Sequence, residues 1–200
     1  GEGARIWWPN KDHITAEGDS VRMAYTVPSN MVAVGNGKLK SVVNNGDKST
    51  YEWFVSNPIN NYNISVQIGN YVAVQDTFIK GDKIYDMNHY VLDYNKELAS
   101  NYFTQSKEVI RFYEKYFGDY QWYEDGYKIV EVPYLGMEHQ SAVTYGNGFS
   151  IYNGVRSKSW PMYGVMDPLI IHETGHEWFG NSVTASDPTH IWIHEGLQVY

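Results

Sequence analysis

Short hydrophobic runs alternate with polar turn formers over the first 80 residues of the chain. The runs are rich in Val, Ile, Tyr and Thr, and clusters of Gly, Asn, Asp and Pro separate them, a pattern typical of strands joined by tight turns. Strands are predicted at 20–27, 31–34, 38–43, 51–55, 63–68 and 71–74. Residues 1–80 are therefore predicted to form a β-rich segment.

The period of the hydrophobic pattern changes near residue 81. Apolar residues recur at helical spacing over 97–117, and Gly118 follows at a position typical of a helix C-cap. A strand is predicted at 127–132, an extended segment at 135–145 and a loop at 146–160. This mixture predicts an α+β region over 81–200.

Two further helices are predicted near the end of the sequence. Asp167 precedes a proline, which places a good N-cap before a residue favoured in the first helical turn, and we expect that helix to end near Gly180. A last helix is predicted after Asp187, and its apolar pattern is still running at Tyr200. We expect the sequence to be the N-terminal part of a longer protein.

Composition and charge narrow the possible functions. The chain is 42% hydrophobic and 19% charged, as in soluble globular proteins, and its net charge of −8 without a Lys/Arg cluster argues against nucleic acid. Its apolar runs fall far short of the ~20 residues of a membrane span. An extracytoplasmic compartment, periplasmic or secreted, is favoured over the cytoplasm. Because the chain has no Cys, any metal must be held by His and carboxylate side chains.

A His-Glu-Thr-Gly-His run at residues 172–176 lies on the helix that Asp167 opens. Side chains at i and i+4 share one helical face, so His172 and His176 can bind one Zn²⁺ ion, with Glu173 beside them as catalytic base. Glu195, nineteen positions after His176, is predicted to be the third zinc ligand. The alternative is a helix with two surface histidines, but chance yields this pentapeptide in only roughly one chain in 70 of this composition.

The run 172–181 together with Trp-Ile-His-Glu-Gly at 192–196 resembles the zinc motif of gluzincin aminopeptidases of the aminopeptidase N type. Upstream, Gly136, Met137 and Glu138 resemble the exopeptidase motif of that family, with His139 at the place where Asn is usual. Residues 8–9 and 28–31 resemble landmarks of its N-terminal domain, so the resemblance spans nearly the whole chain.

The resemblance implies a fold and an activity. The fold is the C-terminal part of a saddle-like β-domain (1–80) followed by the first half of a thermolysin-like catalytic domain (81–200). The activity is removal of the first residue from peptides with a free N-terminus. Glu138 would bind the substrate amine and the backbone of Gly136 and Met137 would line the substrate path. The oxyanion-binding tyrosine of the family lies beyond residue 200, so this part alone is expected to have low activity.

Alternatives to an aminopeptidase remain open at this point. A gluzincin with endopeptidase or altered specificity would fit the incomplete exopeptidase motif, in which Glu138 would be an ordinary polar residue. A non-enzymatic scaffold stabilised by metal would have no need of Glu173. Trp178, Phe179 and Trp192 are predicted to pack beneath the zinc site. Glu177 replaces the Gln that is commoner in the family, and the sequence predicts no role for it.

Overall fold

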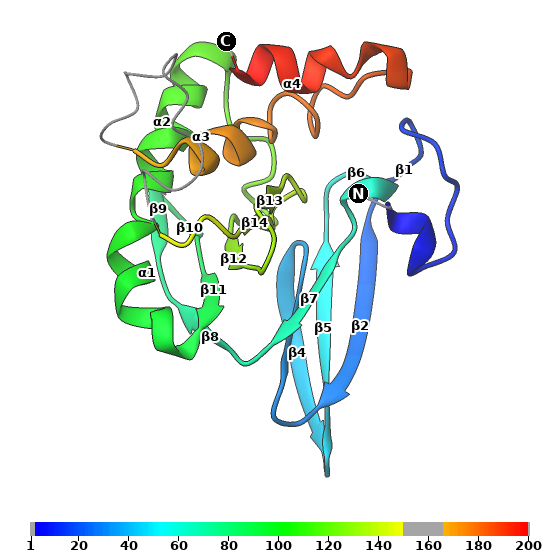
Figure 1. Cartoon of the computed structure of the whole chain (residues 1–200), viewed down its shortest axis with the longest axis vertical. Coiled ribbons are helices and arrows are strands. Elements are labelled where there is room, and N and C mark those ends of the chain that lie inside the picture. Colours follow the sequence, from blue (N-terminus) through cyan, green and yellow to red (C-terminus); the bar gives the residue numbers. More distant parts are fainter. Residues whose placement is uncertain (1–2, 150–165, 200) are drawn as a thin grey trace.

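The computed structural model describes residues 3–149 and 166–199 of the chain (Figure 1). The N-terminal strands form an elongated β-rich part, and the helices gather at the other side of the molecule around a second sheet (Figure 1). Most of the loop predicted at 146–160 lies outside the described residues. No helix within the described ranges combines the length and the hydropathy that a membrane crossing requires.

The β-rich part contains a three-stranded antiparallel sheet of order β2-β5-β4 and two strand pairs, β3 with β7 and β1 with β6. Met23 of β2 lies opposite Trp53 of β5, and both are buried. Their burial fixes the register, because a slip by one residue would move both side chains to the solvent face. The strands are β1 (Glu17–Gly18), β2 (Val21–Pro28), β3 (Val32–Gly35), β4 (Lys38–Asn45), β5 (Lys48–Val55), β6 (Ile59–Asn60) and β7 (Val66–Gly69).

A five-stranded mixed sheet of order β13-β14-β12-β11-β8 connects the two parts. Ile129 packs into the core shared with the helices, whereas its neighbour Val130 packs into the core of the β-rich part. This alternation follows from the period of two along a strand, and it gives the sheet two buried faces. Its strands are β8 (Tyr71–Val74), β11 (His89–Leu92), β12 (Ile129–Glu131), β13 (Gly136–Met137) and β14 (Val143–Tyr145).

The helix predicted over 97–117 is divided into α1 (Lys96–Tyr102) and α2 (Gln105–Phe117). Phe103 separates them; its side chain is fully buried, and its carbonyl accepts hydrogen bonds from both the amide and the hydroxyl of Ser106. These two bonds from Ser106 take the place of regular α-helical bonds between α1 and α2. The sequence pattern also missed a hairpin, β9 (Thr77–Lys80) with β10 (Lys83–Asp86), which precedes the helices.

The metal-motif helix α3 (Pro168–Gly175) ends five residues before the predicted end at Gly180. After Gly175 the backbone bonds change partner: Glu177 N–H donates to the carbonyl of residue 174, and Asn181 N–H donates to the carbonyl of His176, five residues back. Hydrogen bonds to the third and fifth preceding residues thus interrupt the regular α-helical pattern, in which each N–H bonds the fourth preceding carbonyl. The last helix, α4 (Trp192–Val199), follows a 3₁₀ helix at Pro188–His190, close to the predicted position.

Candidate metal centre and substrate pocket

Asp167 anchors the start of α3. Its buried carboxylate accepts a hydrogen bond from the backbone N–H of Leu169 at 2.8 Å, as expected of an N-cap. The same carboxylate accepts bonds from the hydroxyls of Tyr145 at 2.7 Å and Tyr102 at 2.8 Å. Because Tyr145 belongs to β14 and Tyr102 to α1, these bonds fix the helix against both the sheet and its neighbouring helix.

His172 and His176 project from the same face of the α3 segment, and their Nε2 atoms lie 3.2 Å apart. Nδ1 of His176 lies 2.9 Å from the carbonyl of Phe179, which favours a proton on Nδ1 and leaves the Nε2 lone pair available. Burial lowers the pKa of both imidazoles. The neutral ring is the form that binds a metal ion, so this environment suits two ligands.

Glu195 reaches the same point from α4. Its Oε2 lies 3.4 Å from Nε2 of His172 and 3.7 Å from Nε2 of His176. Ligands at the usual ~2.0–2.1 Å from a tetrahedral Zn²⁺ ion are about 3.3–3.4 Å from one another. The three atoms therefore have the spacing of a tetrahedral site, and a two-imidazole, one-carboxylate donor set is one that zinc accepts in catalytic centres. The residues present fit this metal.

Glu173 lies beside this triangle. Its carboxylate oxygen and the ring nitrogens of His172 and His176 all lie within 4.8 Å of one another. We assign the third ligand to Glu195 rather than Glu173, because the distances of Glu195 match tetrahedral coordination more closely. Gly136 packs against Glu173 so tightly that a Cβ atom there would lie 2.6 Å from Oε1 of the carboxylate.

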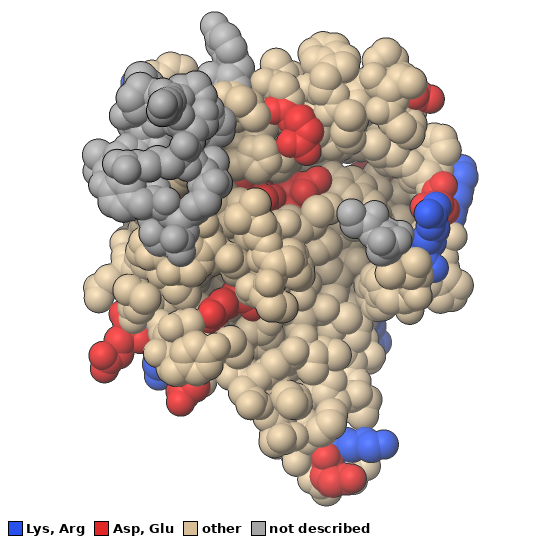
Figure 2. Space-filling view, in the orientation of Figure 1, with Lys and Arg blue, Asp and Glu red and all other residues tan. Residues whose placement is uncertain are grey.

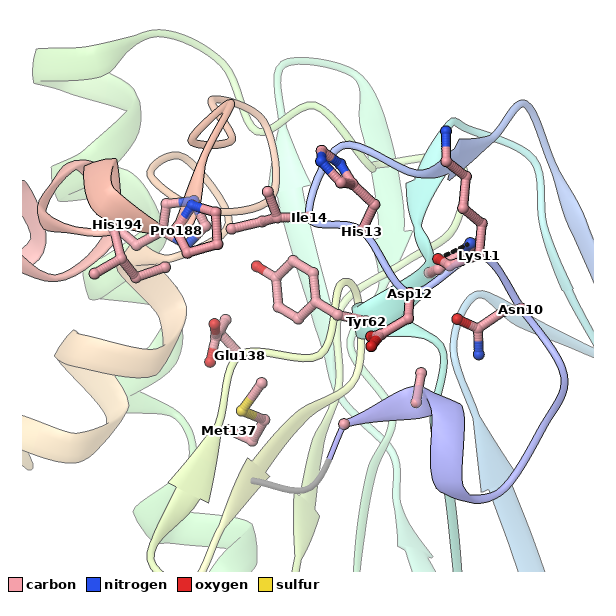
Figure 3. A pocket seen from close by; sticks show the side chains of 14 residues that line it. Asn10, Lys11, Asp12, His13, Ile14, Tyr62, Met137, Glu138, Pro188 and His194 are labelled. Atoms are coloured by element: carbon pink, nitrogen blue, oxygen red, sulfur yellow. Dashed lines mark hydrogen bonds between the residues drawn. The ribbon is translucent and has the colours of Figure 1, made fainter.

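Glu138 lines a pocket of about 450 Å³, whose walls also include His194, the residue before Glu195 (Figure 3). Its carboxylate and the Met137 side chain face the pocket from the β13 side, opposite the ring of Tyr62. Residues from the N-terminal segment, including Ile14, and from the turn just before α4, including Ile191, complete the walls. The pocket thus combines apolar surface with two carboxylates, Glu138 and Asp12, and the amine of Lys11.

Three acidic side chains, Glu138, Glu173 and Glu195, converge at the site, and the pKa is raised for two of them. Burial raises the pKa of Glu173 to about 9, and the charges of Glu138 and Glu195 add to the shift. Burial likewise raises the pKa of Glu138. Figure 2 shows acidic side chains in the hollow beneath the helices at the top of the view. A concave surface with this charge favours cations, whether a metal ion or a protonated amine.

Residues 102–200 match the family model described as the peptidase family M1 domain. This part of the chain belongs to peptidase family M1. Similar curated proteins include Aminopeptidase M1-D of Oryza sativa subsp. japonica, 23% identical over 182 residues, and the glutamyl aminopeptidase of Rattus norvegicus, 27% identical over 176 residues. The matches cover 90% and 86% of this chain but only 20% and 18% of those proteins. The chain therefore spans about a fifth of these M1 relatives.

Solved M1 structures share the fold. An M1 zinc metallopeptidase from Deinococcus radiodurans superposes with a TM-score of 0.80 at 19% identity, and a two-domain M1 zinc metallopeptidase mutant bound to L-arginine with 0.79 at 18%. Each alignment covers 99% of this chain and 42% of the other. The predicted fold, a β-rich domain segment followed by the start of an α+β catalytic domain, is confirmed.

The structure brings together all seven residues that the sequence singled out: the three ligand candidates, Glu173 beside them, Gly136 against Glu173, and Met137 with Glu138 in the adjoining pocket. Trp178 is buried as predicted and stacks on Tyr113. The prediction for Trp192 was wrong, since its side chain is 59% exposed. Tyr62 was missed, because nothing in the strand pattern marks a pocket wall.

Proposed function

We propose that this chain is the N-terminal part of a zinc-dependent aminopeptidase that hydrolyses the first peptide bond of peptides. The observation that carries the proposal is the combination of a tetrahedrally spaced His172, His176 and Glu195 triangle with a second, separate carboxylate in the adjoining pocket. The triangle suits a catalytic metal. The second carboxylate, Glu138, suits a substrate that carries a positive charge.

In this proposal Glu138 binds the protonated amine of the substrate. A buried carboxylate forms a strong ion pair with an ammonium group that reaches it, because little water is left to compete. The side chain of the same substrate residue occupies the pocket between Tyr62, Ile14 and Ile191. The apolar surface of these three side chains favours an apolar first residue.

The substrate backbone pairs with the edge of the five-stranded sheet. β13 is the last strand in the sheet order and pairs only with β14 among the described strands, which leaves its other edge available to an extended peptide. Such pairing would direct the first peptide bond past Glu173, since Gly136 of β13 touches that carboxylate.

Glu173 moves the proton. Its carboxylate takes a proton from the attacking water and passes it to the leaving nitrogen, so that one group acts first as base and then as acid. When bound, the zinc ion supplies Lewis acidity that brings the pKa of a water molecule toward ~7. The positive charge of a metal ion bound by His172, His176 and Glu195 would also favour the ionised form of Glu173, which is the form that accepts a proton.

Amino-acid anilides test the proposal in the full-length protein. Hydrolysis should require a free substrate amine and should stop on chelation and return with Zn²⁺. Glu173→Gln should retain zinc but lose activity, whereas near-normal turnover by that variant would refute the assignment of the base. Equal hydrolysis of free and acetylated substrates would favour an endopeptidase, and zinc binding with no hydrolysis would favour a metal-stabilised scaffold.

A further inference from the structure

Ser141 occupies a strained turn three residues after Glu138. Its φ angle is 59°, in the left-handed region that residues other than glycine seldom adopt, and the residue is fully buried. Such a conformation persists only where the surroundings enforce it. Within the described residues Ser141 is one of two non-glycine residues with positive φ.

Each polar group of Ser141 has a partner from a different part of the molecule. Its N–H donates to Oε1 of Glu177 at 2.7 Å, and its carbonyl accepts from Nζ of Lys128 at 2.9 Å. Its Oγ accepts from the N–H of Gly37 at 2.8 Å. The turn is therefore bonded to the metal-motif segment, to the strand region before β12 and to the β-rich part.

Glu177 and Asn181 connect this turn to the backbone of Glu138. Oε2 of Glu177 accepts a hydrogen bond from Nδ2 of Asn181 at 3.0 Å. The same Nδ2 donates to the carbonyl of Glu138, also at 3.0 Å, while Oδ1 of Asn181 accepts from Nδ2 of Asn63 at 2.7 Å. The turn that carries Glu138 is thus held at both ends by the segment that follows the second histidine.

We propose that Glu177 is a positioning residue for Glu138: through Ser141 and Asn181 it holds the 138–141 turn so that the Glu138 carboxylate faces the pocket. The proposal rests on the proposed function, in which Glu138 binds the substrate amine. Glu177 touches neither the pocket nor the ligand triangle in the described contacts, and it acts through the backbone of the turn.

The hydrogen-bond donors around residue 177 explain why this chain has Glu at a position where Gln is commoner in the family. Both carboxylate oxygens accept hydrogen bonds from nitrogen donors, Oε1 from Ser141 and Oε2 from Asn181. A Gln has one acceptor oxygen, so its NH₂ group would face another donor. Asn181 cannot reverse its amide to compensate, because its Oδ1 already accepts from Asn63. Gln at this place would leave one end of the turn unbonded.

The test compares Glu177→Gln with Asp125→Asn in the full-length protein. Asp125 is a matched control, a buried carboxylate that accepts from the amide and hydroxyl of Ser56, each at 2.7 Å, and from Asn57, without touching the 138–141 turn. Calorimetry would measure binding of L-leucinamide and of its N-acetyl form, and hydrogen exchange would follow the amides of 137–142. Zinc content would be measured in parallel.

Glu177→Gln should weaken leucinamide binding about tenfold, the effect of losing one hydrogen bond to a charged group, while binding of the acetylated form stays the same. It should also speed exchange in 137–142, and Asp125→Asn should change neither. Asn181→Ala, which removes the amide that joins Glu177 to the carbonyl of Glu138, should act in the same direction and serves if Glu177→Gln does not fold.

Equal losses in the Glu177 and Asp125 variants would show a merely structural effect and overturn the proposal, as would unchanged leucinamide binding and exchange in Glu177→Gln. Failure of the unaltered protein to bind leucinamide would count against the proposed amine site itself. The exchange rates of 137–142 would then decide separately whether Glu177 holds the turn.

Discussion

Replacing Gly136 with Ala should damage catalysis without removing the metal. A Cβ atom at this position would lie 2.6 Å from Oε1, 3.0 Å from Cδ and 3.1 Å from Cγ of Glu173. Ordinary van der Waals contact between such atoms requires about 3.5–4.0 Å. The carboxylate must therefore move by about 1 Å, away from the position at which it would exchange protons.

A displacement of this size has a large effect on a reaction that depends on alignment. A misplacement of about 1 Å can cost about 100-fold in rate, so we expect kcat of Gly136→Ala to fall by about 10- to 100-fold. KM should change less, because Glu138 is not displaced. The three atoms nearest the added methyl group all belong to Glu173, so zinc content should stay at the level of the unaltered protein.

The assay is steady-state hydrolysis of an amino-acid anilide, with zinc content and Tm measured on the same samples. Gly18→Ala is a suitable control, because a Cβ there meets its nearest neighbour, the carbonyl oxygen of Ser20, at an ordinary 3.7 Å. Normal kcat in Gly136→Ala with zinc bound would refute the reasoning that Glu173 must occupy its present position. Loss of zinc would show that the methyl group disturbs the ligands instead.

Two further changes test other parts of the account. Glu138→Ala should lower kcat/KM for free-amine anilides by about 10- to 100-fold, the effect of losing a hydrogen-bonded charge. It should leave inhibition by acetylated amino-acid amides unchanged. Equal effects on both would contradict the amine-binding role of Glu138. Burial lowers the pKa of Lys128 from 10.5 to about 7. Between pH 7 and 10.5 the Lys128 amine is therefore protonated in the unfolded chain but mostly neutral in the folded protein. The unfolded state binds more protons, so the free energy of unfolding should rise with pH in this range. In Lys128→Met the slope of the unfolding free energy against pH should be smaller by on the order of 1 kcal/mol per pH unit. Urea titrations at pH 7, 8 and 9 measure this slope, and parallel curves for the two proteins would contradict the prediction.

The metal site could be predicted because its information is local. His172 and His176 are one helical turn apart in sequence, and the N-cap Asp167 fixes where that helix begins. Glu195 required more, namely a third ligand nineteen positions later on the next predicted helix, a separation that the family resemblance also has. The early end of α3 at Gly175 left the site unaffected, since His176 keeps helical backbone angles as the C-cap residue.

The network around Ser141 could not be predicted from the sequence. Its partners Gly37 and Lys128 are 104 and 13 residues away from it along the chain, and neither the hydrophobic period nor any turn motif encodes such contacts. A Ser with positive φ has no sequence signal, because the conformation is imposed by its surroundings. The role of Glu177 depends on the donors that its two carboxylate oxygens meet, and the sequence does not encode them.

Other expectations stay predictions. The boundary between the two domains is predicted at residues 80 and 81, and β8, which precedes it, pairs with β11, which follows it. The two segments therefore share one sheet. The extracytoplasmic location and the low activity expected of this part of the protein also stay predictions.

Anomalous diffraction at the zinc absorption edge tests the central claim most directly. Crystals of the protein grown with Zn²⁺ should show one strong peak between Nε2 of His172, Nε2 of His176 and Oε2 of Glu195, at about 2.0–2.2 Å from each atom. No peak at that position in zinc-containing crystals, or a peak coordinated by other side chains, would contradict the account.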